Sequence, residues 1–177
     1  MLRSLFLLTT SSLVVAACGD DTCGPGSAQG AGLLASSADV VLNYGSLTSG
    51  PNNDCPDAAA PAGVTSLTIQ GAQVGGPGLL TLCIGRPDLL ASGPLQLGTE
   101  VRIIDLNGEA NSCQYAFESA RPVQGTASTS GLCDNGKNSA GYALTVDGAL
   151  SLKRTCNTAI DTIAVTFDGT VAVEATP

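Results

Sequence analysis

Histidine and tryptophan are both missing from this chain of 177 residues. Without an imidazole, the chain cannot build a Ser-His-Asp or Cys-His catalytic site or a histidine-ligated metal site. Cations are scarce too, because 7 Lys and Arg residues face 15 Asp and Glu, giving a formal net charge of −8. So few cations exclude a surface for the phosphate backbone of a nucleic acid. The 3 Tyr and 3 Phe residues also offer little for stacking on sugars or bases.

Common catalytic motifs are absent from the sequence as well. There is no Gly-x-Ser-x-Gly elbow and no Walker loop, and neither Lys137 nor Lys153 lies in a Ser-x-x-Lys motif. The acids fall mainly in turns or stand singly on expected strands, as Glu100, Glu118 and Glu174 do. Such scattered acids are typical of a solvated surface. We therefore expect no catalytic residue and no cofactor.

Two polar stretches resemble sites only superficially. The loop from Asn52 to Asp57 gathers amides and carboxylates, but it lacks the regular acid spacing and the late Glu of a calcium loop. We expect no metal there. Lys153 and Arg154 form a small basic spot on an expected strand, which we predict to be ion-paired with the acidic surface.

The first 17 residues have the organisation of a secretory signal peptide. Arg3 precedes an apolar stretch from Leu5 to Val15, and the small residues Ala16 and Ala17 follow it. This stretch is shorter than the run of about 20 apolar residues that a membrane-spanning helix needs. We therefore expect residues 1–17 to be removed during export.

The order Val15-Ala16-Ala17-Cys18 resembles the lipobox of bacterial lipoproteins, and the resemblance covers residues 1–21 only. In that family the cysteine thiol receives a diacylglyceryl group and the peptide is cut before it. The resemblance thus implies lipidation of Cys18 and attachment to the membrane. In enteric bacteria an Asp directly after this cysteine favours retention in the inner membrane, so Gly19 at that place implies the outer membrane.

The chain has 7 cysteines, and assigning Cys18 to the lipid leaves an even number. An export signal implies an oxidising compartment, in which the remaining cysteines form disulfides. A zinc site is disfavoured, because no close Cys-x₂-Cys pair and no histidine are present. Six cysteines allow many pairings, and pairing them in chain order would give 23–55, 83–113 and 133–156. The disulfide candidates are Cys23, Cys55, Cys83, Cys113, Cys133 and Cys156.

Short alternating apolar runs between turn residues predict strands through most of the mature chain. We expect strands over 39–47, 64–74, 79–84, 95–105, 112–120 and 121–132, with turns at 75–78 and at Asn107-Gly108. After residue 139 we expect an antiparallel meander of four strands, 140–146, 149–156, 161–167 and 170–175. Its tight turns would be Asp147-Gly148 and Asp168-Gly169, since such pairs favour positive φ.

The predicted fold class is therefore all-β. We expect an antiparallel β-sandwich of about 8–9 strands with meander hairpins, a closed β-barrel being the alternative. At most one short helical turn is expected, near residues 87–91. The predicted organisation is a signal peptide over 1–17, a lipid-anchored flexible tether over 18–37 that is rich in small and polar residues, and a disulfide-bridged all-β domain over 38–177.

These patterns favour a lipoprotein of the bacterial cell envelope, outside the cytoplasm, with a non-enzymatic binding or structural domain. Its expected partners are the membrane, through Cys18, and an unidentified protein or envelope component, but not nucleic acid. Two alternatives stay open. A carboxylate-dependent sugar hydrolase would need an acid pair about 5–10 Å apart facing a cleft. A barrel that carries a small apolar ligand would need an enclosed cavity instead of a filled interior.

Overall fold

The computed structural model describes residues 32–45, 47–51, 66–85, 94–134 and 140–175. These residues form eleven strands and no helix, which confirms the all-β fold class. Accordingly, this part of the chain holds no helix that could cross a membrane. The strands are β1 (Gly32–Ser36), β2 (Val41–Tyr44), β3 (Leu47–Pro51), β4 (Ser66–Ala72), β5 (Leu79–Gly85), β6 (Leu95–Gln96), β7 (Val101–Ala110), β8 (Cys113–Phe117), β9 (Gln124–Asp134), β10 (Ala140–Cys156) and β11 (Ala159–Ala175).

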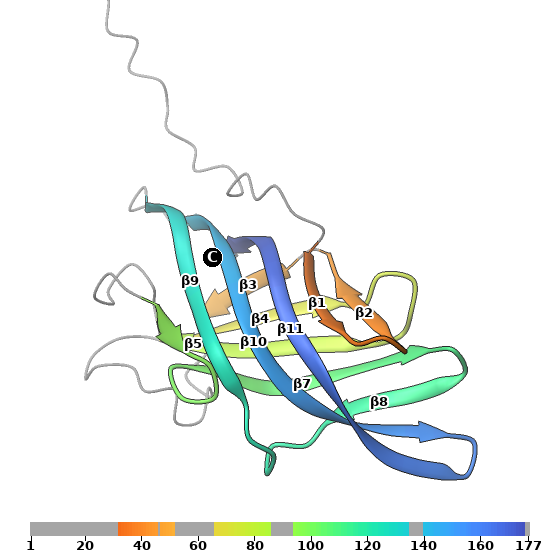
Figure 1. The fold of residues 1–177 in the computed structure, drawn as a ribbon. Helices are drawn as coiled ribbons and strands as arrows, with labels where there is room; N and C mark the ends of the chain where they lie inside the picture. The colour runs from red at the N-terminus through yellow and green to blue at the C-terminus, as the bar shows by residue number, and fades with distance from the viewer. Residues whose placement is uncertain (1–31, 46, 52–65, 86–93, 135–139, 176–177) are drawn as a thin grey trace, which may run out of the picture.

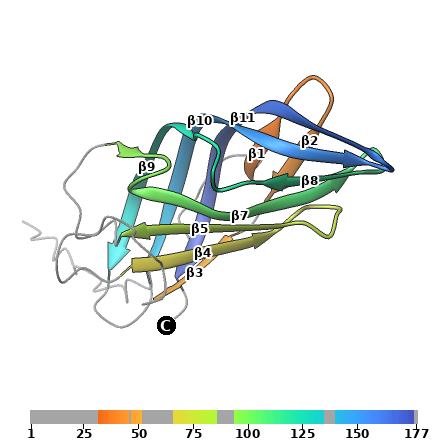
Figure 2. The same ribbon diagram turned by 90° about the horizontal axis from the view of Figure 1, so that it is seen from below.

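The strands lie in two layers that pack face to face, with their directions crossing steeply (Figures 1 and 2). The front layer of Figure 1 holds β2, β1, β11, β10 and β9, and the two-residue β6 pairs with β9. The rear layer holds β3, β4, β5, β7 and β8. The predicted sandwich is thus confirmed, with eleven strands where about 8–9 were expected.

The two layers are joined at both sides. β11 pairs with β3 in parallel, and β10 pairs with β8 in antiparallel fashion, so hydrogen-bonded neighbours can be followed around a partial ring. It is not a regular closed barrel, because the β3–β11 contact spans three residue pairs and β1, β2, β6 and β9 lie outside the ring.

The space between the layers is filled by alternate side chains of the facing strands. Leu80, Leu82 and Ile84 of β5 are all 0% exposed, as expected for alternate residues on the buried face of a strand. Phe167 and Val173 of β11, in the front layer, are also fully buried and belong to the same cluster. The buried apolar residues form one contiguous cluster. The described residues therefore give no support to a barrel with an open apolar interior.

β10 and β11 form a single hairpin of two 17-residue strands, which turns at Asn157 and Thr158. The antiparallel pairing was expected, but the prediction of four short strands joined by two Asp-Gly turns is wrong. Asp147-Gly148 lies within β10, and Asp168-Gly169 lies opposite it within β11.

Glycine allows close backbone approach at these positions instead of making turns. Gly169 has φ +129°, and a Cβ there would overlap the carbonyl oxygen of Gly32 in β1. Gly148 pairs with Gly125 of β9, whose φ is +123°. Glycine inside a strand often marks a bend or a close backbone approach, and here it lets the hairpin bend while neighbouring strands stay paired.

The hairpin consists of two parts with different surroundings. We call residues 140–149 and 166–175 the proximal half; β9 pairs with its β10 side, and β1 and β3 pair with its β11 side. We call residues 150–156 and 159–165 the distal half; it bends away and runs beside β8, as Figure 1 shows at lower right.

The turn predicted at Asn107-Gly108 is also wrong. Both residues lie inside β7, and the chain turns instead at Asn111 and Ser112, whose φ values are 52° and 61°. Two successive positive φ values are the mark of the type I′ turn that two-residue hairpins prefer. A Cβ on Gly108 would lie 2.8 Å from Oε1 of Gln73, so glycine is needed there for side-chain packing.

Other boundaries differ in smaller ways. Gly32–Ser36 forms β1, so the predicted tether over 18–37 extends too far into the domain. The strand expected over 39–47 divides into β2 and β3, and the strand expected over 95–105 divides into β6 and β7 around Gly98, with φ +87°. The turn at 75–78 is confirmed, and the strand expected over 121–132 is observed as β9. The helical turn at 87–91 lies outside the described residues.

Candidate functional site

The best-defined chemical feature is a disulfide between Cys113 and Cys156. Cys113 begins β8 and Cys156 ends β10, and the two residues are directly opposite each other in the antiparallel register, with Cα atoms 4.3 Å apart. The predicted pairings 83–113 and 133–156 are therefore wrong. Pairing in chain order fails because β8 pairs with β10, while β9, which lies between them in sequence, pairs with the other half of β10.

The remaining cysteines are placed only in part. Cys83 is buried in β5 and is disulfide-bonded, to a cysteine other than 113 or 156. Cys133 lies in β9 opposite Gly141 by its backbone. Cys18, Cys23 and Cys55 lie outside the described residues, so lipidation of Cys18 stays a prediction.

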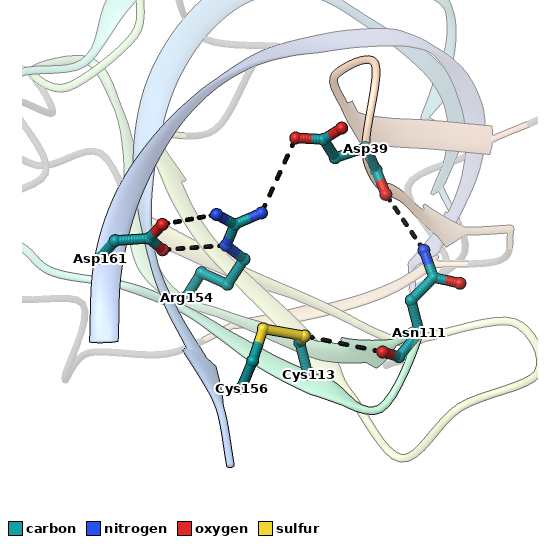
Figure 3. The surroundings of a disulfide bond; sticks show 6 residues. All are labelled: Asp39, Asn111, Cys113, Arg154, Cys156 and Asp161. Carbon is teal, nitrogen blue, oxygen red and sulfur yellow. Dashed lines mark hydrogen bonds and ion pairs between the residues drawn. A yellow bond between two sulfur atoms is a disulfide. The ribbon is translucent and has the colours of Figure 1, made fainter. Parts of the chain in front are cut away.

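Arg154 organises a polar cluster next to this disulfide, where the distal half meets the β1–β2 loop (Figure 3). Its Nε donates to Oδ1 of Asp161 at 2.9 Å, and Nη2 bonds the other carboxylate oxygen. Its Nη1 lies 3.7 Å from Oδ2 of Asp39. The side-chain amide of Asn111 donates to the carbonyl of Asp39 at 3.1 Å. The ion pairing expected for this basic spot is confirmed for Arg154.

The charges of this cluster reinforce each other. The hydrogen bond from Arg154 is the largest effect and holds the pKa of the Asp161 carboxyl below its ordinary value; burial acts in the opposite direction, and the positive charge of Arg154 adds to the lowering. The same hydrogen bond raises the pKa of Arg154. Arg154 thus stays charged and ties a front-layer loop to the distal half, which is a positioning role and not a reactive one.

Gln73 is a buried amide that no sequence motif identifies. Gln73 is 8% exposed, and its Nε2 donates to the carbonyl of Glu109 at 2.8 Å while Oε1 accepts from the N–H of Glu109 at 2.9 Å. Oε1 also accepts from the N–H of Gly78. The neighbouring Gly-Gly-Pro-Gly segment was the available signal, since a Cβ on Gly76 or Gly78 would come within 2.6 Å of this side chain. Gln73 thus fixes the β4–β5 turn against β7.

Tyr44 is likewise a structural group. Its hydroxyl donates to the carbonyl of Asn107 at 2.6 Å. Burial, followed by the negative charge of Asp105, raises the pKa of Tyr44 above its ordinary value. A phenol whose pKa moves away from neutrality is poorly suited to proton transfer at neutral pH.

Of two concavities in the described part of the chain, one has no acid among its lining residues and the other has only Glu109, whereas a sugar hydrolase would need a pair of acids. Asp147 and Asp168 are opposite each other on β10 and β11, but they project from the outer face of the front layer, next to the hydrogen-bonded Thr145–Thr170 pair. Glu100 accepts from the N–H of Gln96 at 2.7 Å. The hydrolase alternative therefore gains no support from these residues.

Metal ligation has no support among the described side chains either. There, no group of three or more His, Cys, Asp or Glu residues could hold a metal ion. The polar loop at Asn52–Asp57, where no metal was expected, lies outside the described residues.

A shallow concavity of about 250 Å³ lies between the β6–β7 turn and the β8–β9 loop. Arg102, Arg121, Thr99, Ser119 and Phe117 are among the residues that line it. Nε of Arg121 is 2.7 Å from Oε2 of Glu118, and Arg102 also has an interaction partner, so both guanidinium groups of the concavity are already engaged. The concavity therefore lacks the converging reactive groups of a catalytic site.

The Arg154 cluster, the buried amide and the disulfide all connect structural elements to one another. No protein-family model, curated protein or solved structure matches this chain.

Proposed function

We propose that the chain is a bacterial lipoprotein, held to the membrane through lipidated Cys18, that presents a non-enzymatic, disulfide-bridged β domain outside the cytoplasm. The observation that carries the proposal is the Cys113–Cys156 disulfide. Disulfides persist in exported proteins and are rare in the cytosol. The disulfide therefore supports export, which the lipobox-like end of the signal peptide independently predicts.

The cysteine count also supports this proposal. An odd total of 7 cysteines would leave one thiol unpaired in an exported protein. Thioether formation at Cys18 removes that odd thiol. Cys113, Cys156 and Cys83 already take part in disulfides, so the proposal requires Cys23, Cys55 and Cys133 to be bonded as well.

A binding or structural role is supported by what the polar groups do. The described side chains with shifted pKa values are Tyr44, Arg154 and Asp161, and each is committed to a contact between two strands or loops. Catalytic groups, by contrast, converge on a pocket with perturbed pKa values. We therefore propose a rigid scaffold that recognises an envelope component or protein, with the outer membrane as its location.

Replacement of the anchoring thiol tests the proposal. We expect wild-type chain in a bacterial host to appear in the membrane fraction and to incorporate labelled palmitate. Cys18→Ser should incorporate no label and should either keep the mass of the precursor or leave the membrane, because no thioether can form. Gly19→Ser is the matched control, since it adds the same side chain one position later and keeps the thiol.

A membrane-bound Cys18→Ser protein of mature length would contradict lipidation.

The disulfide part of the proposal has its own measurement. The mature chain, denatured without reductant, should react with no thiol reagent, and it should expose six thiols after reduction, since the chain has 7 cysteines and one carries the lipid. Labelling without reductant would contradict it.

A further inference from the structure

Among the described strands, one edge of the sheet is open in the distal half of the hairpin. On its outer side, β11 pairs with β1 over Thr166–Thr170 and with β3 over Val173–Ala175. Residues 159–165 pair with β10 on one side, and no described strand pairs with their other side. An open strand edge presents unpaired N–H and C=O groups to any other extended chain.

The register identifies which backbone groups are open. Cys156 and Ala159 flank a two-residue turn, and residues that flank such a turn exchange hydrogen bonds with each other. Hydrogen-bonded pairs alternate along the hairpin, so Ile160, Thr162 and Ala164 direct their N–H and C=O groups away from β10. Thr166 is the next alternate residue after Ile160, Thr162 and Ala164, and it is the first β11 residue that pairs with β1. Its pairing on that side agrees with the outward direction of the N–H and C=O groups of the other three residues.

This edge has few of the usual protections against pairing. Residues 159–165 contain no proline and no lysine, which are common protections of natural edges. Their one charge, Asp161, is ion-paired with Arg154. Ile160 is 65% exposed, the largest exposure among the exposed large hydrophobic residues.

We propose that this edge binds the same edge of a second copy of the chain, in antiparallel pairing about a twofold axis at Thr162. Such an isologous contact places Ile160 opposite Ala164 of the other copy and Thr162 opposite Thr162. All the outward N–H and C=O groups of the three open residues on each copy then gain partners. The exposed Ile160 packs beside a small side chain.

Charge and length both select this register. Asp161 would face Ile163 of the other copy, whereas an axis one residue away, at Asp161, would set two carboxylates opposite each other, which is unfavourable. The open edge ends at the turn on one side and at Thr166, where β1 begins to pair, on the other. Two copies of this segment therefore match in length.

The contact is small, so the dimer is weak and concentration-dependent. Interfaces well below about 1,000 Å² are typical of transient association. Each copy also has a net charge of −8 before processing, so the copies repel each other over several ångströms. Because salt screens such repulsion, the dimer should tighten as ionic strength rises.

Introducing a charge at the axis tests the pairing directly. The full processed chain in a neutral, density-matched detergent should show concentration-dependent dimers by sedimentation velocity. Thr162→Lys and Thr162→Glu should each weaken the dimer, by about two- to fivefold, because like charges would oppose each other across the axis. A mixture of the two variants should form a mixed dimer at least as tight as the wild type. Thr145→Lys, on the outer face of the proximal half with strands on both sides, is the matched control and should dimerise like the wild type.

Removal of an outward N–H gives a second, independent measurement. Thr162→Pro removes a hydrogen bond at both sides of the axis and leaves the β10 pairing intact, so we expect dimerisation to weaken about tenfold or more. Amide exchange of residues 159–165 should slow with rising concentration in the wild type and not in this variant. A chain that stays monomeric at all concentrations overturns the proposal. A dimer that the three Thr162 variants leave unchanged also overturns it, and shows that another surface or a foreign strand is the contact.

Discussion

The proximal and distal halves of the β10–β11 hairpin are made of the same two strands, yet they are stabilised differently. In the proximal half, strands lie on both sides, and Leu144, Phe167 and Val173 are fully buried. In the distal half, Leu152 is still buried, but one strand edge is open and Ile160 at the end is exposed.

The interactions that stabilise the two halves differ accordingly. The proximal half relies on apolar burial, the dominant stabilising term in folding, and on glycines that permit close approach. The distal half adds the Cys113–Cys156 disulfide and the Arg154–Asp161 ion pair. Where packing from two layers ends, covalent and ionic links hold the strands.

The largest effect is expected from filling a close approach in the proximal half. Gly169→Val should destabilise the chain by about 3 kcal/mol or more, because a β-branched side chain would overlap β1 and φ is +129° at that position. Urea unfolding followed by circular dichroism measures the change. Ala164→Val, on the exposed side of the distal half, is the control and should stay within about 0.5 kcal/mol of the wild type. Equal losses in both variants would contradict the difference between the halves.

Loss of the disulfide should follow in size. The double substitution Cys113→Ser and Cys156→Ser is expected to cost about 2–4 kcal/mol, since the crosslink closes a long loop in the unfolded chain. Hydrogen exchange should rise first at residues 150–165, because the disulfide lies at the far end of the distal half, while residues 166–173 keep their protection. Uniform loss of protection along the hairpin would show that the two halves unfold as one unit.

The smallest effect is expected from the ion pair, and it depends on pH. Because the folded pKa of Asp161 is lowered, its contribution is present above its ordinary value of 3.8 and is lost as pH falls through the folded value. Asp161→Asn should therefore lower stability at neutral pH and should make acid unfolding less steep.

Asp168→Asn provides the matched control from the proximal half. Asp168 faces Asp147 and not a cation, so its neutralisation should leave stability at neutral pH unchanged or slightly raise it. Thermal unfolding at neutral pH and near pH 3 compares the two variants. A loss of stability at neutral pH from Asp168→Asn that equals the loss from Asp161→Asn would contradict the assigned role of the ion pair.

Local sequence patterns predicted much of the β structure, but they wrongly predicted turns at several glycines. The alternation in Leu80, Leu82 and Ile84 identified a buried face, because side chains in a strand alternate between the two sides of a sheet. Asp147-Gly148 and Asp168-Gly169 favoured turns because glycine tolerates positive φ. The sequence alone cannot tell whether that freedom serves a turn or a close approach by a strand that is distant in the chain.

The candidate contacts were harder to predict than the strands. The ion pairing of Arg154 followed from its acidic surroundings, but its bridge to Asp39 depends on how a front-layer loop meets the distal half. Gln73 lies in no recognisable motif, and only the neighbouring Gly-Gly-Pro-Gly segment signalled a close contact there. Its role exists only because β4, β5 and β7 bring Gly78 and Glu109 to the same amide.

The amino-acid sequence by itself determined the all-β class, the exclusion of imidazole chemistry, the expected export and the positions of most strands, because these depend on composition and on short-range periodicity. The tertiary structure alone decided that Cys113 meets Cys156, that two long strands replace four short ones and that one strand edge stays open. Those outcomes depend on which distant strands become neighbours, and strand pairing across long sequence separations is set by the packing of the whole domain.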